Sequence, residues 1–191
     1  MNPSYTGRHV QALTIPIFLV SAVATLISAL GSDRLRHRYS FAMLGYLITL
    51  VGLIMFLCQK SLSHHALYGA LFLVSIGTYL TLPLIWTMCV NNVSGYYKTS
   101  IASGLCVGFG NAGGIIASCI FVNTEAPYYW TGFRVDFGLT IAAALMTTGL
   151  LVGLRAENHK RDKGGRDYRY NLPREEIDNL GDNHPQFRFV Y

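Results

Sequence analysis

The stretch IASGLCVGFGNAGGIIASCIF, residues 101–121, contains no charged side chain and supports two quite different interpretations. Gly108, Gly110 and Gly113 form a G-x-G-x-x-G pattern, which in dinucleotide-binding proteins binds the pyrophosphate. The same glycines lie inside an apolar run long enough to cross a bilayer, since a spanning helix needs about 20 such residues. The first interpretation predicts a nucleotide-dependent enzyme, and the second predicts a membrane protein.

The surroundings of the glycines favour the membrane interpretation. A dinucleotide fingerprint follows a strand, opens a helix and is followed about 20 residues later by an acidic side chain. Asp136 lies at roughly that spacing, but residues 101–121 are one continuous apolar run with no strand-to-helix break before the glycines. The sequence also lacks a G-x-S-x-G motif and a P-loop, so we expect no enzymatic activity and no cofactor.

Within a membrane helix the glycines have a different meaning. Gly104 and Gly108 form a G-x-x-x-G motif, and small residues at this spacing let helices approach closely where lipid supplies no hydrophobic drive. We therefore expect helix packing along a face made of Gly104, Gly108, Gly110, Gly113 and Gly114.

The composition extends this interpretation to the whole chain. Only 13% of the 191 residues are charged and 51% are hydrophobic, whereas about 25% of an average soluble domain is charged. The uncharged runs are residues 9–32, 39–59, 61–97, 99–124 and 137–154. They predict an all-α polytopic membrane protein whose transmembrane domain covers residues 1–154, with spans at about 10–30, 40–58, 66–90, 101–121 and 133–154. Residues 155–191 form a polar cytoplasmic tail, in which we expect one short helix from Pro173 to Gly181 and a mobile remainder.

The basic residues predict the orientation. Arg34, Arg36 and Arg38 follow the first span, Lys98 precedes the fourth, and six more basic residues lie in the tail within residues 155–169. Positive residues collect on the cytoplasmic side, so these connections and the C-terminus should be cytoplasmic. The net charge of +5 is explained by these flanks and needs no nucleic-acid partner.

The four cysteines give no sign of a metal site. Cys58, Cys89, Cys106 and Cys119 lie in or at the ends of apolar runs, without a C-x-x-C pair or a histidine at ligand spacing. We expect no metal and interpret these cysteines as small apolar side chains.

Three stretches resemble one family of transporters. GSDRLRHRYSF, residues 31–41, resembles the D-R-x-x-R loop of major facilitator superfamily proteins. Residues 86–118, WTMCVNNVSGYYKTSIASGLCVGFGNAGGIIAS, are similar to the N-N-x-x-G-x-x-K loop and G-F-G-N-x-G-G helix of the fungal anion:cation symporter group that includes the allantoate permeases. The ending NLGDNHPQFRFVY, residues 179–191, looks like that group's D-x-x-x-x-F-R-Y ending.

The resemblance implies the C-terminal half of a twelve-helix transporter, with the five spans as helices eight to twelve. It implies a symporter of small organic anions such as allantoate, vitamins or carboxylates, located in the plasma membrane. Because the N-terminal half and the seventh helix have no counterpart here, we expect a partial transporter that is inactive until a matching half completes it. The alternative is a non-transporting fragment or half-module that needs a partner to fold.

A few polar residues are site candidates. Asn111, in the middle of residues 101–121, either forms a structural hydrogen bond to a neighbouring helix or lines a substrate cavity, since polar groups are costly in lipid. Thr78 and Tyr79, near Pro83, are further cavity candidates. Arg134 and Asp136 are two residues apart, so they should not face each other on a helix.

The remaining candidates lie in the first basic loop. By the resemblance, Asp33, Arg34 and Arg38 form a cytoplasmic latch loop; alternatively, the loop is an ordinary topogenic one. A lone carboxylate at the end of a helix faces the negative end of the helix dipole. We therefore expect Asp33 to pair with an arginine of this loop or to point at the start of an adjacent helix.

Overall fold

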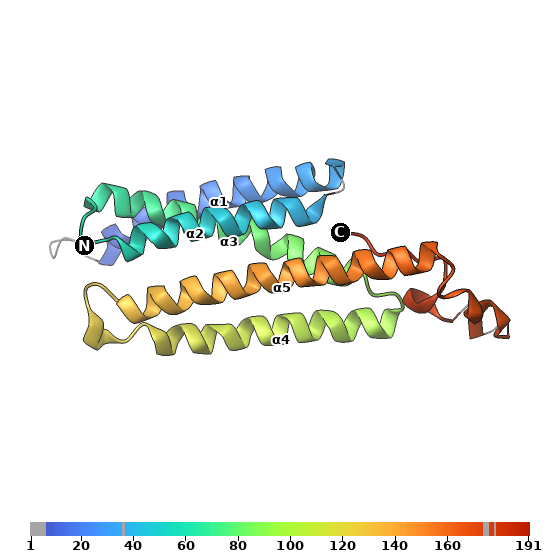
Figure 1. The fold of residues 1–191 in the computed structure, drawn as a ribbon. Helices are drawn as coiled ribbons and strands as arrows, with labels where there is room; N and C mark the ends of the chain where they lie inside the picture. The colour runs from blue at the N-terminus through green and yellow to red at the C-terminus, as the bar shows by residue number, and fades with distance from the viewer. Residues whose placement is uncertain (1–6, 36, 174–175, 178) are drawn as a thin grey trace.

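The protein was studied as a computed structural model that describes residues 7–35, 37–173, 176–177 and 179–191. Figure 1 shows long helices that run back and forth across the molecule. They are α1 (Gly7–Leu35), α2 (Arg38–Leu57), α3 (His64–Asn91), α4 (Tyr96–Ile120) and α5 (Trp130–Asp162). A short 3-10 helix, η1 (Asn123–Glu125), lies between α4 and α5, and two more, η2 (Asp167–Asn171) and η3 (Gly181–Asn183), follow α5. All five long helices are long and apolar enough to cross a membrane. The predicted all-α fold with five membrane spans is confirmed.

The helix bounds differ from the expected spans mainly at their ends. The sequence places His64 and His65 in a loop, but α3 begins at His64 because the Ser63 hydroxyl accepts a hydrogen bond from the Ala66 N–H and caps the helix. α5 extends to Asp162, beyond residue 154 where the last span was expected to end. Helices therefore continue past the apolar runs that identified them.

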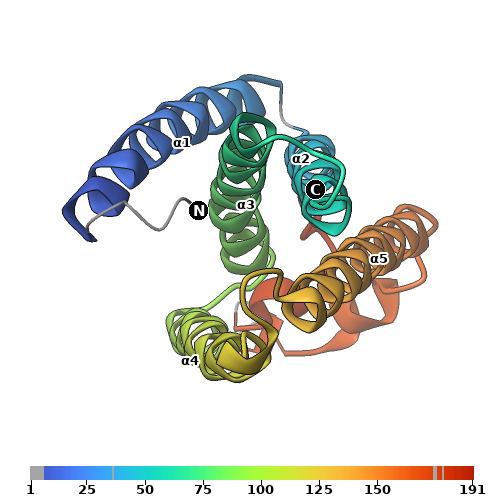
Figure 2. The same cartoon turned by 90° about the vertical axis from the view of Figure 1, so that its left-hand side faces the viewer.

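α3 occupies the centre of the bundle (Figure 2). It packs against α2 along most of its length and against α1 on another side, while α5 packs against α2. α4 lies at the edge, and its contacts with α3 and α5 are much less extensive. Of the described residues, none of α4 is buried.

Small residues bring α2 and α3 into close contact. A Cβ added to Gly77 would lie 2.6 Å from the Gly45 carbonyl oxygen, and one added to Gly52 would lie 3.1 Å from the Ala70 carbonyl oxygen. The buried Thr49 and Thr81 hydroxyls donate to carbonyls four residues earlier in their own helices, at 3.0 and 2.9 Å. These bonds leave no polar group unpaired in the tightest part of the core.

Hydroxyl pairs connect α2 to α5. The Tyr46 hydroxyl lies 3.2 Å from Thr147 Oγ1, and the Tyr39 hydroxyl lies 3.1 Å from Thr148 Oγ1. Hydrogen bonds between side chains help to hold membrane helices in register, at about 0.6 kcal/mol each on average.

The helices place the tail beside two connections of the bundle. Because the helices alternate in direction, the α1–α2 connection, the α3–α4 loop and the C-terminal tail all lie at one end, here called the tail end (Figure 1). The opposite end holds the α2–α3 and α4–α5 connections. The tail was expected to be largely mobile, but its last ten residues fold back and bond to the helix ends. The helix ends supply polar partners for the tail backbone, and the mobility of the tail stays a prediction. The short helix expected from Pro173 to Gly181 falls partly outside the described residues.

Candidate functional site

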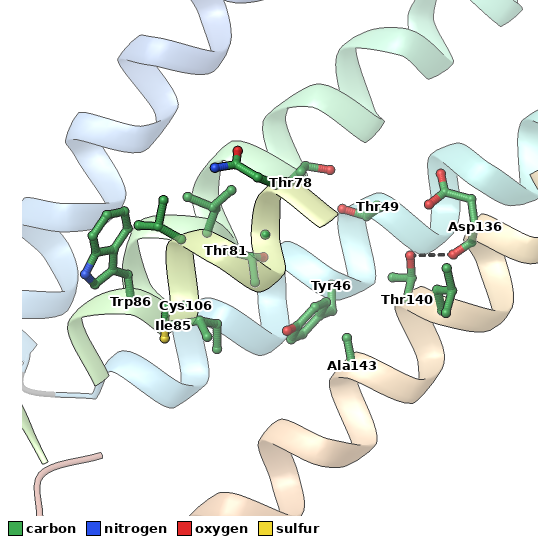
Figure 3. A pocket seen from close by; sticks show the side chains of 15 residues that line it. Tyr46, Thr49, Thr78, Thr81, Ile85, Trp86, Cys106, Asp136, Thr140 and Ala143 are labelled. Carbon is green, nitrogen blue, oxygen red and sulfur yellow. Dashed lines mark hydrogen bonds between the residues drawn. The ribbon is translucent and has the colours of Figure 1, made fainter. Parts of the chain in front are cut away.

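A cavity of about 710 Å³ lies between α2, α3, α4 and α5. Its volume is typical of small-molecule sites. Figure 3 shows its lining, which is Tyr46, Thr49, Thr78, Thr81, Leu82, Ile85, Trp86, Cys106, Val107, Gly110, Asn111, Asp136, Leu139, Thr140 and Ala143. The cavity is open because α4 stands off from its neighbours.

Apolar side chains dominate this cavity, and a few polar groups converge on it. Thr78 of α3, Asn111 of α4 and Thr140 of α5 bring polar groups to the cavity from three helices. Thr140 Oγ1 donates to the Asp136 carbonyl at 2.8 Å, whereas the Asn111 amide bonds to none of the described residues. The cavity thus has the composition of a ligand site, with apolar walls and a free amide able to donate or accept hydrogen bonds.

Two of the three predicted cavity residues line the cavity. Asn111 and Thr78 do, and a contact of either side chain with substrate stays a prediction. Tyr79 does not: its ring packs edge-on against Phe18 of α1, with centroids 6.1 Å apart, and its carbonyl accepts a bond from Thr25 of α1. Consecutive helical residues point about 100° apart, so Thr78 and Tyr79 face different neighbours.

The sequence did not identify Asp136 as a cavity residue. Its two-residue spacing from Arg134 predicts that the two do not face each other, and the Arg134 guanidinium lies instead 5.7 Å from the centre of the Trp130 ring. Asp136 instead lines the cavity one to two turns into α5. The sequence does contain a signal for this position, because Asp136 directly precedes an apolar run and ionisable groups inside a membrane usually face the interior of a bundle.

The predicted glycine face packs closely against no other helix among the described residues. A Cβ added to Gly104, Gly108, Gly110, Gly113 or Gly114 would meet nothing within 4 Å. Gly110 borders the cavity, and the face as a whole is open. The close packing expected there is therefore not made with α1, α2, α3 or α5, and it stays a prediction about helices outside this chain.

The first basic loop contains the expected ion pair. Arg38 Nη2, in the first turn of α2, lies 2.9 Å from Asp33 Oδ1 in the last turn of α1. Arg34, the third residue of the predicted latch loop, lies in the last turn of α1. Arg36, the other arginine of this loop, lies outside the described residues. An exposed pair of this kind contributes about 0–1 kcal/mol. It joins the ends of two helices, and a latch function remains a prediction.

Comparison with known proteins identifies relatives for this arrangement. The MFS-type transporter cnsO of Penicillium expansum is 28% identical over 99% of this chain, and the high-affinity nicotinic acid transporter of Saccharomyces cerevisiae is 27% identical over 98%. An uncharacterized transporter of Schizosaccharomyces pombe is 30% identical over 83%. The chain is similar to fungal transporters of the major facilitator type.

This similarity concerns only part of each relative. The chain spans 38%, 35% and 32% of the length of these three transporters, about a third of each. No protein-family model matches the chain, and no solved structure matches it significantly. The similarity therefore concerns about a third of each transporter, and the five long, apolar helices of this chain are consistent with a multi-pass membrane protein.

Proposed function

We propose that this chain is one part of a membrane transporter of the major facilitator type that carries a small organic anion. The observation that carries the proposal is its similarity, over 98% of its length, to a high-affinity nicotinic acid transporter. Nicotinic acid is a carboxylic acid and is therefore an organic anion at neutral pH. The five apolar helices and the open cavity between four of them are consistent with this role.

Further helices would complete the carrier. Alternating access requires two groups of helices that move against each other around a central site. The relatives are about three times as long as this chain, and α4 presents an unburied face of small residues. The chain would therefore transport only when the complementary helices pack against it.

The cavity groups have separable roles in this proposal. Asn111 and Thr78 would donate hydrogen bonds to a carboxylate. Asp136 would repel an anion when it is ionised, and protonation would remove this repulsion. Its carboxyl group is therefore suited to bind a proton together with the anion, as intramembrane carboxylates do in transporters. The group of symporters that the sequence resembles also implies a plasma-membrane location with a cytoplasmic tail.

Uptake measurements test this proposal. The chain is reconstituted in vesicles with and without a complementary set of helices from a relative, and uptake of labelled organic anions, beginning with nicotinate, is measured. We expect saturable uptake only with the complementary helices, and a loss of at least about tenfold in Asn111→Leu, as removal of a hydrogen bond to a charged ligand predicts. Tyr79→Phe is the matched control, because Tyr79 lies outside the cavity. Saturable uptake by the chain alone would show that no further helices are needed.

A further inference from the structure

The last ten residues, Asp182 to Tyr191, cross the tail end of the bundle from α5 to the α3–α4 loop. Figure 1 shows the C-terminus folded back over the helices instead of pointing away from them. This stretch forms no helix after η3 ends at Asn183. Some of its N–H groups bond locally, as that of Phe187 does to the His184 carbonyl, and the other backbone groups need partners from elsewhere in the molecule.

Two asparagine side chains supply these partners in the same way. Asn158 Nδ2 donates to the Phe189 carbonyl at 2.9 Å, and the Phe189 N–H donates to Asn158 Oδ1 at 2.9 Å. Asn92 Nδ2 donates to the Val190 carbonyl at 2.8 Å, and the Val190 N–H donates to Asn92 Oδ1 at 2.8 Å. Each asparagine amide thus pairs with both the N–H and the carbonyl of one tail residue. Binding of this kind does not depend on the side chain of the tail residue.

Arg161 binds the preceding part of the same stretch. Its side chain is buried, and Nη1 donates to the carbonyls of Asp182, His184 and Phe187 at 3.0, 3.3 and 3.0 Å. Glu157 accepts a bond from Arg161 Nε at 3.1 Å and shares its negative charge between Arg161 and Arg166, which it also binds. A buried guanidinium is costly to leave without hydrogen-bond acceptors, so the three tail carbonyls are part of the environment that Arg161 requires.

Aromatic side chains add contacts on one side of the peptide. The Arg161 guanidinium lies 4.6 Å from the centre of the Phe189 ring, and the Arg155 guanidinium lies 5.0 Å from that of Tyr191. The Phe187 and Phe189 rings contact each other edge-on at 5.2 Å. Phe187, Phe189 and Tyr191 alternate along the chain, as side chains on one face of an extended peptide do.

The partners of this peptide come from three helices. Asn92 caps the end of α3, Lys98 in the first turn of α4 pairs with Asp182 at 2.8 Å, and Asn158 and Arg161 lie near the end of α5. α4 makes few other contacts with α5. The peptide is therefore the main connection between the α3–α4 loop and the end of α5.

We propose that Asn92, Asn158 and Arg161 form a binding site for a peptide that turns at residues 184–187 and continues as an extended segment with alternating aromatic residues at 187–191. Residues 182–191 occupy this site in the chain, and their binding holds the α3–α4 loop against α5. The site recognises mostly backbone, and the aromatic residues set the register of the bound peptide. This proposal is independent of transport, because it concerns contacts made within the chain.

Hydrogen exchange in the full chain tests the binding. Asn158→Ala should speed exchange of the Phe189 N–H, and Asn92→Ala that of the Val190 N–H, each about tenfold, as loss of the hydrogen bond from that N–H to the asparagine Oδ1 predicts. Asn91→Ala is the matched control, because Asn91 is the exposed neighbour of Asn92. Circular dichroism verifies that the helices remain. Unchanged exchange in both variants would overturn the proposed site.

A distance measurement tests the holding function separately. Spin labels at Tyr97 of α4 and Lys160 of α5, both exposed, are introduced into a chain whose four cysteines are replaced. We expect one narrow distance distribution in the otherwise unaltered chain and a broad one in the Asn92→Ala, Asn158→Ala double variant. Faster exchange with an unchanged distance distribution would overturn the claim that the peptide holds the loop against α5.

Discussion

Single glycines on α2 and α3 set the closest helix contact in this molecule. Gly45 and Gly77 lie where neither helix has room for a side chain, because a Cβ on either would fall within 3 Å of the other's carbonyl oxygen. The glycines of α4 form the more obvious sequence motif, yet they face open space. A small-residue motif shows that a helix can be approached closely, and it does not show which helix approaches it.

Gly77→Ala should therefore destabilise the bundle by about 1–3 kcal/mol, the usual cost of overpacking a tight core. The added methyl group would force α2 and α3 apart, since it would lie 2.6 Å from a backbone oxygen that cannot rotate away. Unfolding of the purified chain in detergent, followed by circular dichroism, measures the change. Gly69→Ala, also on α3 but with nothing within 4 Å, should be neutral or slightly stabilising. Equal stability of the two variants would contradict the close contact.

The N-terminus of α5 is capped by a residue that precedes the helix. Glu125 of η1 accepts a hydrogen bond from the Thr131 N–H at 2.8 Å and a second from the Thr131 hydroxyl. The N–H groups at the start of a helix lack partners within it, so this carboxylate acts as a cap. These bonds to Thr131 lower the pKa of Glu125 below its ordinary value of 4.5.

The lowered pKa predicts a pH-dependent cap. Since the pKa of Glu125 is lower in the folded chain, its stabilising contribution is present above the ordinary value of 4.5 and is lost as the pH falls through the folded value. The amide shift of Thr131, followed by NMR, should titrate with a midpoint below 4.5. Glu125→Gln should abolish this titration. A midpoint at or above 4.5 in the unaltered chain would contradict the cap.

Across the whole molecule, charge and helix direction together predict one orientation. The α1–α2 connection, the α3–α4 loop and the tail share one end of the bundle, and these segments carry most of the basic residues. Positive residues favour the cytoplasmic side, so this end should face the cytoplasm. The bonds between Asn92 and Val190 also require the loop and the C-terminus to lie on the same side.

Glycosylation measures this orientation. Asn92-Val93-Ser94 is an acceptor sequon in the α3–α4 loop, and it should remain unmodified in a eukaryotic cell because a cytoplasmic loop never meets the glycosylation machinery. An acceptor site joined through a flexible linker after Tyr191 should also stay unmodified, whereas one joined before Met1 should receive a glycan. A glycan on Asn92 or on the C-terminal acceptor would show that the orientation is the opposite one.

The membrane fold was predictable from the order of residues along the chain. Each expected span overlaps one helix of the structure, closely for 40–58 and 66–90, which correspond to Arg38–Leu57 and His64–Asn91. This success has a local cause, because the length of an apolar run decides whether a segment can cross lipid. The Asp33–Arg38 pair was predictable for the same reason, since its members are close in sequence.

The cavity and the tail site depend on the folding of distant segments against each other. The rotation of α3 places Thr78 in the cavity and Tyr79 against α1, and the position of α5 brings Asp136 to the same cavity. Asn92 and Val190 are 98 residues apart, so no local pattern could indicate their pairing. In lipid, helix rotation and register follow from detailed packing and not from an apolar stripe. The pattern along one helix therefore predicts that it spans the membrane, and only the assembled bundle determines which of its faces meet.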